Sequence, residues 1–227
     1  MIRAVLFDLD ETLYSFKEAN AHAVGVVADR FEKETGFPHE RFDEENWRLF
    51  HKQCERVGLQ AGCHSRGVRF QMFCEEHGFP LRLAAPMNDL FWNSFLEVMK
   101  PYPGAAETFD EIRARGLRLG IGTNMTADWQ LKKLAVLGLI DKIDFVVSSE
   151  ESGADKPDPN LFRICAEKAG CAPDECVFVG DSLEHDVAGS KAVGMRPVWI
   201  MPDSEKRAAH PDIESIGALP ELLAILP

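Results

Sequence analysis

From Pro101 onward, short apolar β-forming segments alternate with helical patterns. This alternation is typical of βαβ units, whose strands form a parallel sheet. A helix is predicted to begin after Thr126, and another to begin at Pro159, with Asp158 as its N-cap and Gly170 at its end. The strands that we predict around these helices are Leu117–Thr123, Phe145–Ser148, Val177–Gly180 and Pro197–Met201.

The N-terminal part of the chain has a different pattern. Val5–Asp8 resembles another buried strand, but between it and Pro101 there are only helical patterns, near residues 17–35, 40–57, 66–77 and 87–98. We therefore predict an α/β core built from residues 1–15 and 100–227. An all-helical module of residues 16–99 is inserted after the first strand.

Composition excludes several classes of function. The chain has 227 residues, and its 37 acidic and 25 basic side chains give a net charge of −12, which argues against binding of a nucleic-acid polymer. No apolar run approaches the roughly 18 residues needed to cross a bilayer, so no membrane partner is expected. The N-terminus reaches an acidic residue too early for a signal peptide, and the six cysteines form no C-x-x-C pair. We expect a cytoplasmic protein with reduced thiols.

Polar side chains follow the predicted strands. In open parallel sheets, ligands bind beyond the carboxyl ends of the strands, so these side chains are candidates for one site. Each alone has a simpler reading as a turn, loop or helix-cap residue. Together they supply the parts that transfer of a phosphoryl group requires. The candidates are Asp8, Asp10, Thr123, Asn124, Lys156, Asp181 and Asp186.

Two of these acids suit a nucleophile and a metal site. A carboxylate such as Asp8 can act as the nucleophile, as carboxylates do in aspartyl-phosphate chemistry. Mg²⁺ prefers oxygen ligands and keeps several waters, which suits Asp8, the main-chain carbonyl of Asp10, and Asp181. The expected cofactor is therefore Mg²⁺, because it would reduce the repulsion between an anionic nucleophile and an anionic phosphate.

The remaining candidates suit phosphate binding and proton transfer. We expect Thr123, Asn124 and Lys156 to hold the other phosphate oxygens, acting by position and charge. The side chain of Asp10 is not needed by the metal, so it is free to protonate the leaving oxygen and later to deprotonate the attacking water. Two acids placed two positions apart thus receive two different roles.

Four blocks of the chain, in order, resemble the motifs of the haloacid dehalogenase superfamily of hydrolases. They are "DLDET" (family pattern D-x-D-x-T), the strand ending in "GTN", the block "GADKPDP", and "GDSLEHD" (family pattern G-D-x-x-x-x-D). The resemblance covers the predicted core on both sides of the helical insert. It implies an α/β fold with a Rossmann-like parallel sheet and an inserted all-helical cap domain of the C1 type.

The resemblance also implies roles for individual residues. Asp8 and Asp10 correspond to the catalytic acids, and Thr123 and Lys156 to phosphate ligands. Asp8, Asp10 and Asp181 correspond to the magnesium ligands. Asp186 would orient Lys156 or a metal-bound water.

One residue indicates the branch of the superfamily. The dehalogenases of this superfamily lack the second aspartate, because a halide leaving group needs no proton. The presence of Asp10 therefore favours phosphate-ester hydrolysis. Glu11 replaces a common glycine and, with Leu13 and Tyr14, resembles the nucleotidase and sugar-phosphate branches. We expect a monomer or homodimer that hydrolyses a small phosphorylated metabolite, a nucleoside monophosphate or a sugar phosphate. The alternatives are a phosphomutase, a phosphonatase, a dehalogenase relative, or a non-catalytic binding protein on the same fold.

One segment of the helical insert differs from its packing stripes. Leu59–Phe70 carries His64, Arg66 and Arg69 around two glycines. A solvated loop is the simpler interpretation, and contact with the substrate is the alternative.

Overall fold

The computed structural model describes residues 1–227, which separate into two units. One unit consists of Met1–Ser15 and Lys100–Pro227, and the other of Phe16–Met99. The first, which we call the α/β unit, contains a parallel sheet flanked by helices, and the second, the helical unit, contains helices alone. The predicted fold class, an α/β parallel sheet with an all-helical insert, is therefore confirmed.

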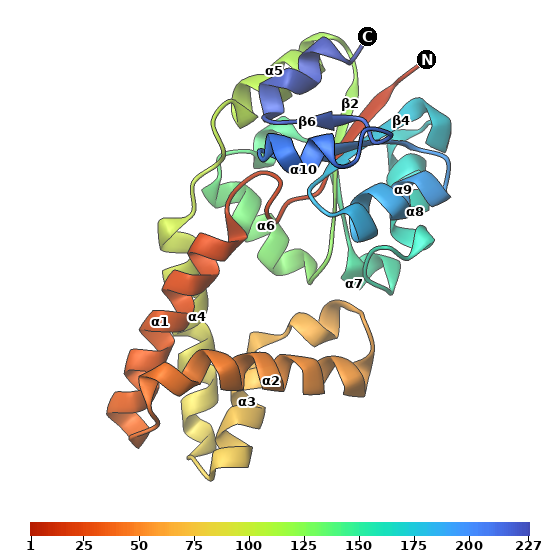
Figure 1. Ribbon diagram of the computed structural model, residues 1–227. Coiled ribbons are helices and arrows are strands. Elements are labelled where there is room, and N and C mark those ends of the chain that lie inside the picture. The colour runs from red at the N-terminus through yellow and green to blue at the C-terminus, as the bar shows by residue number, and fades with distance from the viewer. The chain divides into compact units, whose positions relative to one another are not determined.

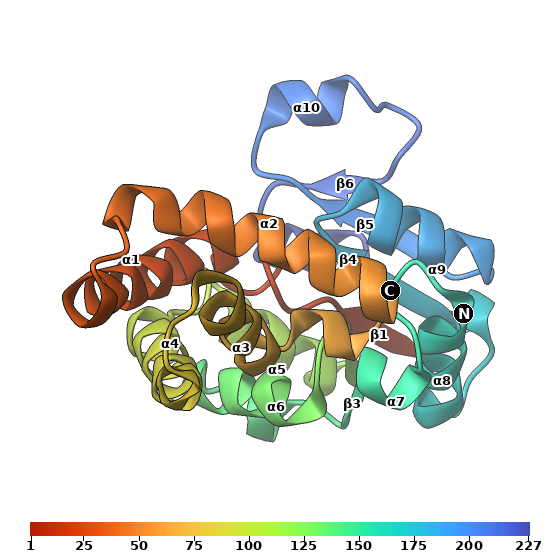
Figure 2. The same cartoon turned by 90° about the horizontal axis from the view of Figure 1, so that it is seen from below.

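The sheet of the α/β unit has six parallel strands in the order β3-β2-β1-β4-β5-β6, and Figure 1 and Figure 2 together label all of them. The last strand was not predicted, because two residues are too few to give a hydrophobic period. The other five lie within one residue of their predicted bounds at each end. The strands are β1 (Ala4–Phe7), β2 (Arg118–Thr123), β3 (Phe145–Ser148), β4 (Cys176–Gly180), β5 (Arg196–Ile200) and β6 (Ser215–Ile216).

Helices connect these strands, and the best-defined signals in the sequence set their ends. The predicted helix at Pro159 is α8: the Asp158 side chain accepts from the backbone N–H of Asn160 at 2.9 Å, and Gly170 ends the helix in a left-handed conformation. The remaining helices of this unit are α5 (Ala105–Ala114), α6 (Ala127–Val136), α7 (Ser149–Ser152), α9 (Gly189–Ala192) and α10 (Ser204–Ala208). Short turns are η3 (Ile140–Lys142), η4 (Pro173–Glu175), η5 (Leu183–Ala188) and η6 (Leu219–Ala224).

The two faces of the sheet are covered by different helices. Neighbouring residues of a strand point to opposite faces, so Leu6 and Phe7 report on one face each. Leu6 belongs to the core cluster that includes Leu161 and Phe162 of α8, whereas the Phe7 ring lies 4.9 Å from that of Phe109 in α5. Helices α5 and α8 therefore pack on opposite faces of the sheet, and α9 lies beside α8 (Figure 1).

The register of the central strands brings their carboxyl ends together. Phe7, the last residue of β1, pairs with Ile121 of β2 on one side and with Val179 of β4 on the other. The residues that follow these strands therefore emerge at one edge of the sheet. That edge is where an open parallel sheet binds ligands.

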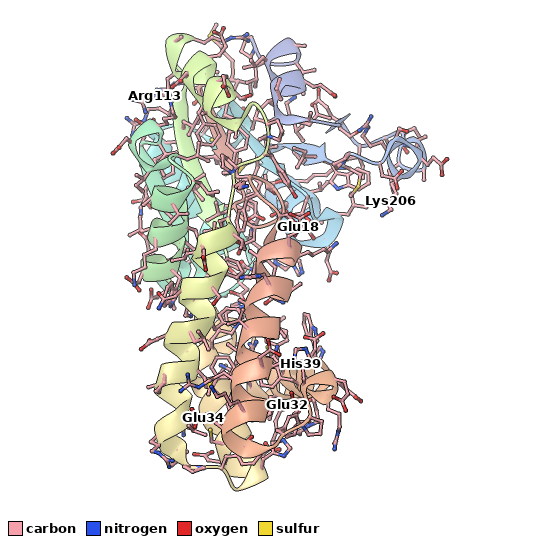
Figure 3. The ribbon with its side chains drawn as sticks, turned by 90° about the vertical axis from the view of Figure 1, so that its left-hand side faces the viewer. Glu18, Glu32, Glu34, His39, Arg113 and Lys206 are labelled. Atoms are coloured by element: carbon pink, nitrogen blue, oxygen red, sulfur yellow. The ribbon has the colours of Figure 1, made fainter.

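The helical unit packs around aromatic side chains. The rings of Phe42 and Phe73 lie 5.4 and 4.8 Å from that of Phe31, and all three side chains are buried. Polar residues such as Glu32, Glu34 and His39 are exposed around the turn between the first two helices (Figure 3). The elements are α1 (Phe16–Thr35), α2 (His39–Val57), η1 (Ala61–His64), α3 (Arg66–His77), η2 (Leu81–Leu83) and α4 (Ala84–Val98).

No helix of the chain combines the length and the apolar character that crossing a bilayer requires.

The contact of α8 with the sheet predicts the effect of one core substitution. Phe162 is fully buried, and its ring lies 4.9 Å from that of Phe178. Replacing Phe162 by Ala should lower the free energy of unfolding by about 3–5 kcal/mol, because apolar area is lost and a cavity remains. The matched control is V136A at a half-exposed position of α6, which should change stability by less than about 0.5 kcal/mol. Denaturant unfolding followed by circular dichroism measures both; equal midpoints would contradict this packing.

Candidate active site

The site begins with a buried acid at the end of the central strand. Asp8 follows β1, and its backbone N–H donates to the carbonyl of Val179 at 2.9 Å, which continues the pairing with β4. Its side chain is only 10% exposed, and Oδ1 lies 2.6 Å from Nζ of Lys156. The structure thus brings together two predicted site residues that lie 148 positions apart in the sequence.

Lys156 is held by two further contacts. Its Nζ lies 2.7 Å from Oδ1 of Asp186, and its backbone N–H donates to Oδ1 of Asn124 at 2.8 Å. Burial lowers the pKa of Lys156, but the charges of Asp186 and Asp8 outweigh burial and leave the pKa above its usual value. The ammonium therefore stays charged between two carboxylates.

Asp186 reaches this position from η5, a π-helical turn of a kind often found at functional sites. Its Oδ2 accepts from the backbone N–H of Ser182 at 3.0 Å, so both carboxylate oxygens have partners. The carboxylate also lies over Gly180: a Cβ at that position would be 2.3 Å from Cγ and from Oδ2 of Asp186. Only glycine leaves room for Asp186 here.

Three carboxylates form a cluster at this edge. Asp8, Asp181 and Asp186 each place an oxygen within 4.8 Å of the other two. Burial raises the pKa of Asp8 to about 8; Lys156 opposes this increase, and the other acids add to it. Burial and the charge of Asp186 raise the pKa of Asp181 to about 6. The three carboxylates of the cluster outnumber the single lysine beside them, so a bound cation would offset their remaining negative charge.

The donor set fits a magnesium ion. All three side chains of the cluster offer carboxylate oxygens, the ligands that Mg²⁺ prefers, and none offers nitrogen or sulfur. Asp181 is only partly buried, so water can complete the coordination. Its position is fixed by Trp199, whose Nε1–H donates to the Asp181 carbonyl at 2.7 Å. Asp186, predicted only to orient Lys156 or a metal-bound water, also lies close enough to contribute.

Asp10 has different surroundings from Asp8. Its carboxylate accepts from Nζ of Lys133 at 2.8 Å (Oδ1) and 3.1 Å (Oδ2), and the Tyr14 hydroxyl also donates to Oδ1. Burial raises the pKa of Asp10, but the charge and hydrogen bond of Lys133, with the bonds from Tyr14 and Gln130, outweigh it and lower the pKa. The two acids of "DLDET" are therefore shifted in opposite directions.

Two of the predicted phosphate-binding residues, Thr123 and Asn124, lie at the end of β2. Thr123 is buried, and its Oγ1 accepts from Nε2 of Gln130 at 2.7 Å. Asn124 uses its Oδ1 to hold the backbone of Lys156, which leaves its amide N–H groups as donors. Lys156 contacts Asp8, and Thr123 and Asn124 lie at the end of the strand that neighbours β1. The binding of phosphate by these three residues stays a prediction.

Sequence reasoning missed Gln130, Lys133 and Tyr14. All three side chains are buried and contact Asp10. The spacing of Gln130 and Lys133 puts them on one helical face, but polar residues on a helix normally indicate the solvent side. No feature of the sequence marks this face as buried.

The arginines of the helical unit that sequence analysis singled out make contacts within that unit. Arg66 donates to Oδ1 of Asn20 at 2.7 Å, and its guanidinium lies 4.4 Å from the ring centre of Phe91. Arg69 is buried and donates to the carbonyl of Cys63 at 3.2 Å. Contact of this segment with a substrate remains an expectation.

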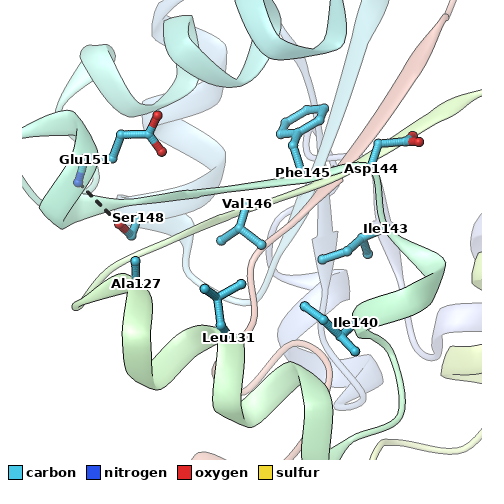
Figure 4. Close-up of a pocket in the computed structure, with 9 residues that line it drawn as sticks. All are labelled: Ala127, Leu131, Ile140, Ile143, Asp144, Phe145, Val146, Ser148 and Glu151. Atoms are coloured by element: carbon cyan, nitrogen blue, oxygen red, sulfur yellow. Dashed lines mark hydrogen bonds between the residues drawn. The ribbon is translucent and has the colours of Figure 1, made fainter.

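A separate groove of about 320 Å³ lies between α6 and β3 (Figure 4). In it, Oγ of Ser148 accepts from the backbone N–H of Glu151 at 3.2 Å. None of the predicted site residues lines this groove, and most of its lining side chains are apolar. Its lining residues are Ala127, Leu131, Ile140, Ile143, Asp144, Phe145, Val146, Ser148 and Glu151.

Known proteins resemble this chain over most of its length. The sequence pattern of the family described as haloacid dehalogenase-like hydrolase matches residues 2–194. A ribulose-1,5-bisphosphate 5-phosphatase of Halopiger xanaduensis is 34% identical over 99% of this chain and 100% of its own length. A glyceraldehyde 3-phosphate phosphatase of Methanopyrus kandleri is 31% identical over 94% of this chain and 88% of its own length.

Solved structures share the fold. The crystal structure of a HAD phosphatase from Thermococcus onnurineus has a TM-score of 0.74 and 26% identity, and the match covers 99% of this chain and 97% of that one. A 2-haloacid dehalogenase from Pseudomonas syringae also has a TM-score of 0.74, with 29% identity and 99% coverage of both chains. The fold alone therefore does not separate phosphatase from dehalogenase chemistry.

The contact between Gly180 and Asp186 gives a prediction. In G180A, the added methyl group should displace the Asp186 carboxylate and lower the free energy of unfolding by about 1–3 kcal/mol, the usual cost of overpacking. The control is G25A in α1, where a Cβ meets no atom within 4 Å. That change should raise stability by about 0.5–1 kcal/mol, because alanine favours a helix. Denaturant unfolding of both variants tests this, and an unchanged G180A would contradict the close approach.

Proposed function

Because the chain belongs to the haloacid dehalogenase-like hydrolase family, we propose that it is a magnesium-dependent phosphatase that hydrolyses a small phosphomonoester through a phosphoaspartate on Asp8. The resemblance inferred from the four sequence blocks is confirmed by the family match. The expectation of a phosphatase enzyme is confirmed as well, because relatives of the chain are named phosphatases. The metal, the intermediate and the substrate are the parts that we propose.

The observation that carries the proposal is the contrast between Asp8 and Asp10. Asp8 lies against Lys156 in a cluster of acids, where a cation would keep it ionised as a nucleophile. Asp10 is held by Lys133 and Tyr14, outside that cluster. Two carboxylates whose surroundings shift their pKa values apart are suited to two different roles.

In the first step, Asp8 attacks phosphorus while Lys156, Thr123 and Asn124 donate to the phosphate oxygens. When bound to Asp8, the Asp10 main-chain carbonyl and Asp181, Mg²⁺ supplies positive charge that offsets the charge of the phosphate. Asp10 gives its proton to the leaving oxygen. The low pKa of Asp10 opposes this form, but a bound phosphate brings negative charge, which raises the pKa again.

In the second step, water attacks the phosphorus of the phosphoaspartate, and Asp10, now a carboxylate, takes its proton. Asp186 keeps Lys156 in place during both steps through its 2.7 Å contact. Asp8 is released with its own oxygens, and phosphate leaves.

The relatives favour a sugar phosphate as the substrate. Two of them, at 34% and 31% identity, are named for phosphorylated sugars, whereas the sequence motifs alone are compatible with both sugar phosphates and nucleoside monophosphates. The proposed partner is therefore a small phosphorylated sugar rather than a nucleic-acid polymer. We also propose that the protein works in the cytoplasm as a monomer or homodimer.

The dehalogenase relative supports a second candidate function. At 29% identity, it is named a 2-haloacid dehalogenase and has the same fold. Asp10 argues against that chemistry here, because a halide leaves without a proton and has no use for a positioned acid.

Substitution of the two acids tests their roles. D8N should abolish turnover, because the nucleophile is lost. D10N should lower kcat for a sugar phosphate by about 10²–10⁴-fold, the usual value of acid–base catalysis. With p-nitrophenyl phosphate, whose leaving group scarcely needs a proton, the loss should be smaller. Steady-state rates with both esters measure this; an equal loss for the two would remove Asp10 from proton transfer.

The pKa values of the acid cluster predict how pH affects metal binding. Without metal, the raised pKa of Asp8, about 8, favours the folded state while Asp8 is protonated, and this stabilisation is lost as pH rises from about 4 through 8. Mg²⁺ must displace that proton, so its apparent affinity should fall by about tenfold for each pH unit below 8. Calorimetric titration between pH 6 and 8.5 measures the affinity. A constant affinity over this range would contradict the proposed ligands.

A further inference from the structure

Helix α6 sends two buried polar side chains to the site. Gln130 and Lys133 are both 0% exposed, and residues three positions apart lie on the same face of a helix. Burial of a polar group costs free energy unless hydrogen bonds replace its contacts with water, and burial of a charge costs more. The contacts of these two side chains therefore indicate what they do.

Gln130 connects two site residues of different strands. Its Nε2 lies 2.7 Å from Oγ1 of Thr123, 2.7 Å from the carbonyl of Asn124 and 3.4 Å from Oδ2 of Asp10. The carbonyl and the carboxylate carry no hydrogen, so the amide nitrogen has to face them. Its Oε1 is buried without a partner, which typically costs about 1–3 kcal/mol. The three acceptors of the site therefore determine the orientation of the Gln130 amide, although this orientation leaves Oε1 without a hydrogen bond.

This orientation determines what Thr123 can do. Its Oγ1 accepts from Gln130, so its own hydroxyl proton is available for another acceptor. The only acceptor for that proton in the structure is the Asn124 carbonyl, at 3.3 Å. A phosphate oxygen would offer a stronger, charged acceptor.

Lys133 fixes the other site residue. Its Nζ contacts both oxygens of Asp10, at 2.8 and 3.1 Å, and the Tyr14 hydroxyl donates to the first of them. A carboxylate that is held through both oxygens cannot rotate about its terminal bond. The direction in which Asp10 presents its oxygens is therefore set from α6.

We propose that Lys133 and Gln130 are positioning residues for the reaction. Lys133 fixes the carboxylate of Asp10, and Gln130 ties that carboxylate to the hydroxyl of Thr123, so that the proton-transfer group and the phosphate ligand keep a constant relative position. This inference rests on the proposed roles of Asp10 and Thr123. The alternative is that the pair only stabilises the fold.

The first experiment replaces Lys133 by Met, which keeps the length of the side chain and removes the ammonium. In K133M, kcat for a sugar phosphate should fall about 10–100-fold, with a smaller fall for p-nitrophenyl phosphate and less than about a twofold change in KM, because the loss acts through Asp10. The matched control is K132M, whose exposed lysine pairs with Asp128 on the same helix and should leave both rates unchanged. A purely structural role would lower the rates with both esters equally, and that result would overturn the proposal.

A double-mutant cycle separates this proposal from the proposed function. If Lys133 acts through Asp10, K133M should change kcat by less than about twofold when D10N is already present. Full additivity of the two losses would overturn the positioning role while leaving Asp10 in proton transfer. If D10N alone showed no preference between the esters, the function proposed for Asp10 would fail first, and this inference with it.

A second variant keeps the test decisive if K133M does not fold. Q130M leaves the Lys133–Asp10 pair in place and removes the donor to Thr123. The inhibition constant for inorganic phosphate should rise about fivefold or more in Q130M, because Thr123, which is proposed to bind the phosphate, loses the hydrogen bond from Gln130 that orients its hydroxyl. The same substitution in a T123A background should have no further effect on phosphate inhibition. An unchanged inhibition constant in Q130M would contradict the link between Gln130 and Thr123.

Discussion

The ammonium of Lys156 lies between two buried carboxylates, 2.6 Å from Asp8 and 2.7 Å from Asp186, and the arrangement of the site depends on this contact. Burial of an ion pair costs free energy because both charges lose their contacts with water. Removal of one partner typically lowers the free energy of unfolding by about 3–5 kcal/mol, since the other charge is left buried and uncompensated. Several features of the chain serve to keep the three groups together. Asn124 holds the backbone of Lys156, Ser182 holds Asp186, and the missing side chain at position 180 leaves room for it.

The same contact explains why two acids two positions apart can differ. Burial and the neighbouring acids raise the pKa of Asp8, against the opposing charge of Lys156, which Asp8 shares with Asp186. Burial raises the pKa of Asp10 as well, but the charge and hydrogen bond of Lys133, with the bonds from Tyr14 and Gln130, outweigh it and lower the pKa. Each lysine thus defines the environment of one acid. In the proposed reaction, this separation lets one carboxylate attack phosphorus while the other carries a proton.

Parallel topology is what made much of the site predictable from the sequence. Once β1, β2 and β4 are neighbours in a parallel sheet, the residues after them have to meet at one edge, and Asp8, Thr123 and Asp181 follow from that rule. The inward face of helix α6 could not be predicted in this way, because the helix buries Gln130 and Lys133 while Leu131 and Val136 stay about half exposed. Hydrophobic periodicity predicts the reverse, since it cannot register a buried charge whose partner is distant in sequence. Strand β6 was not predicted for another reason: two residues are too few to show a hydrophobic alternation.

The central claim is that Asp8 becomes phosphorylated, and trapping of that intermediate tests it most directly. The D10N variant with p-nitrophenyl phosphate is the suitable system, because the first step scarcely needs the proton while the second step loses its base. The reaction is quenched in acid, digested with pepsin at low pH, and the peptide that contains Asp8 is weighed by mass spectrometry. We predict one phosphoryl group on that peptide, removed by hydroxylamine and absent from D8N. Continued release of phosphate with an unmodified Asp8 peptide throughout would contradict the account.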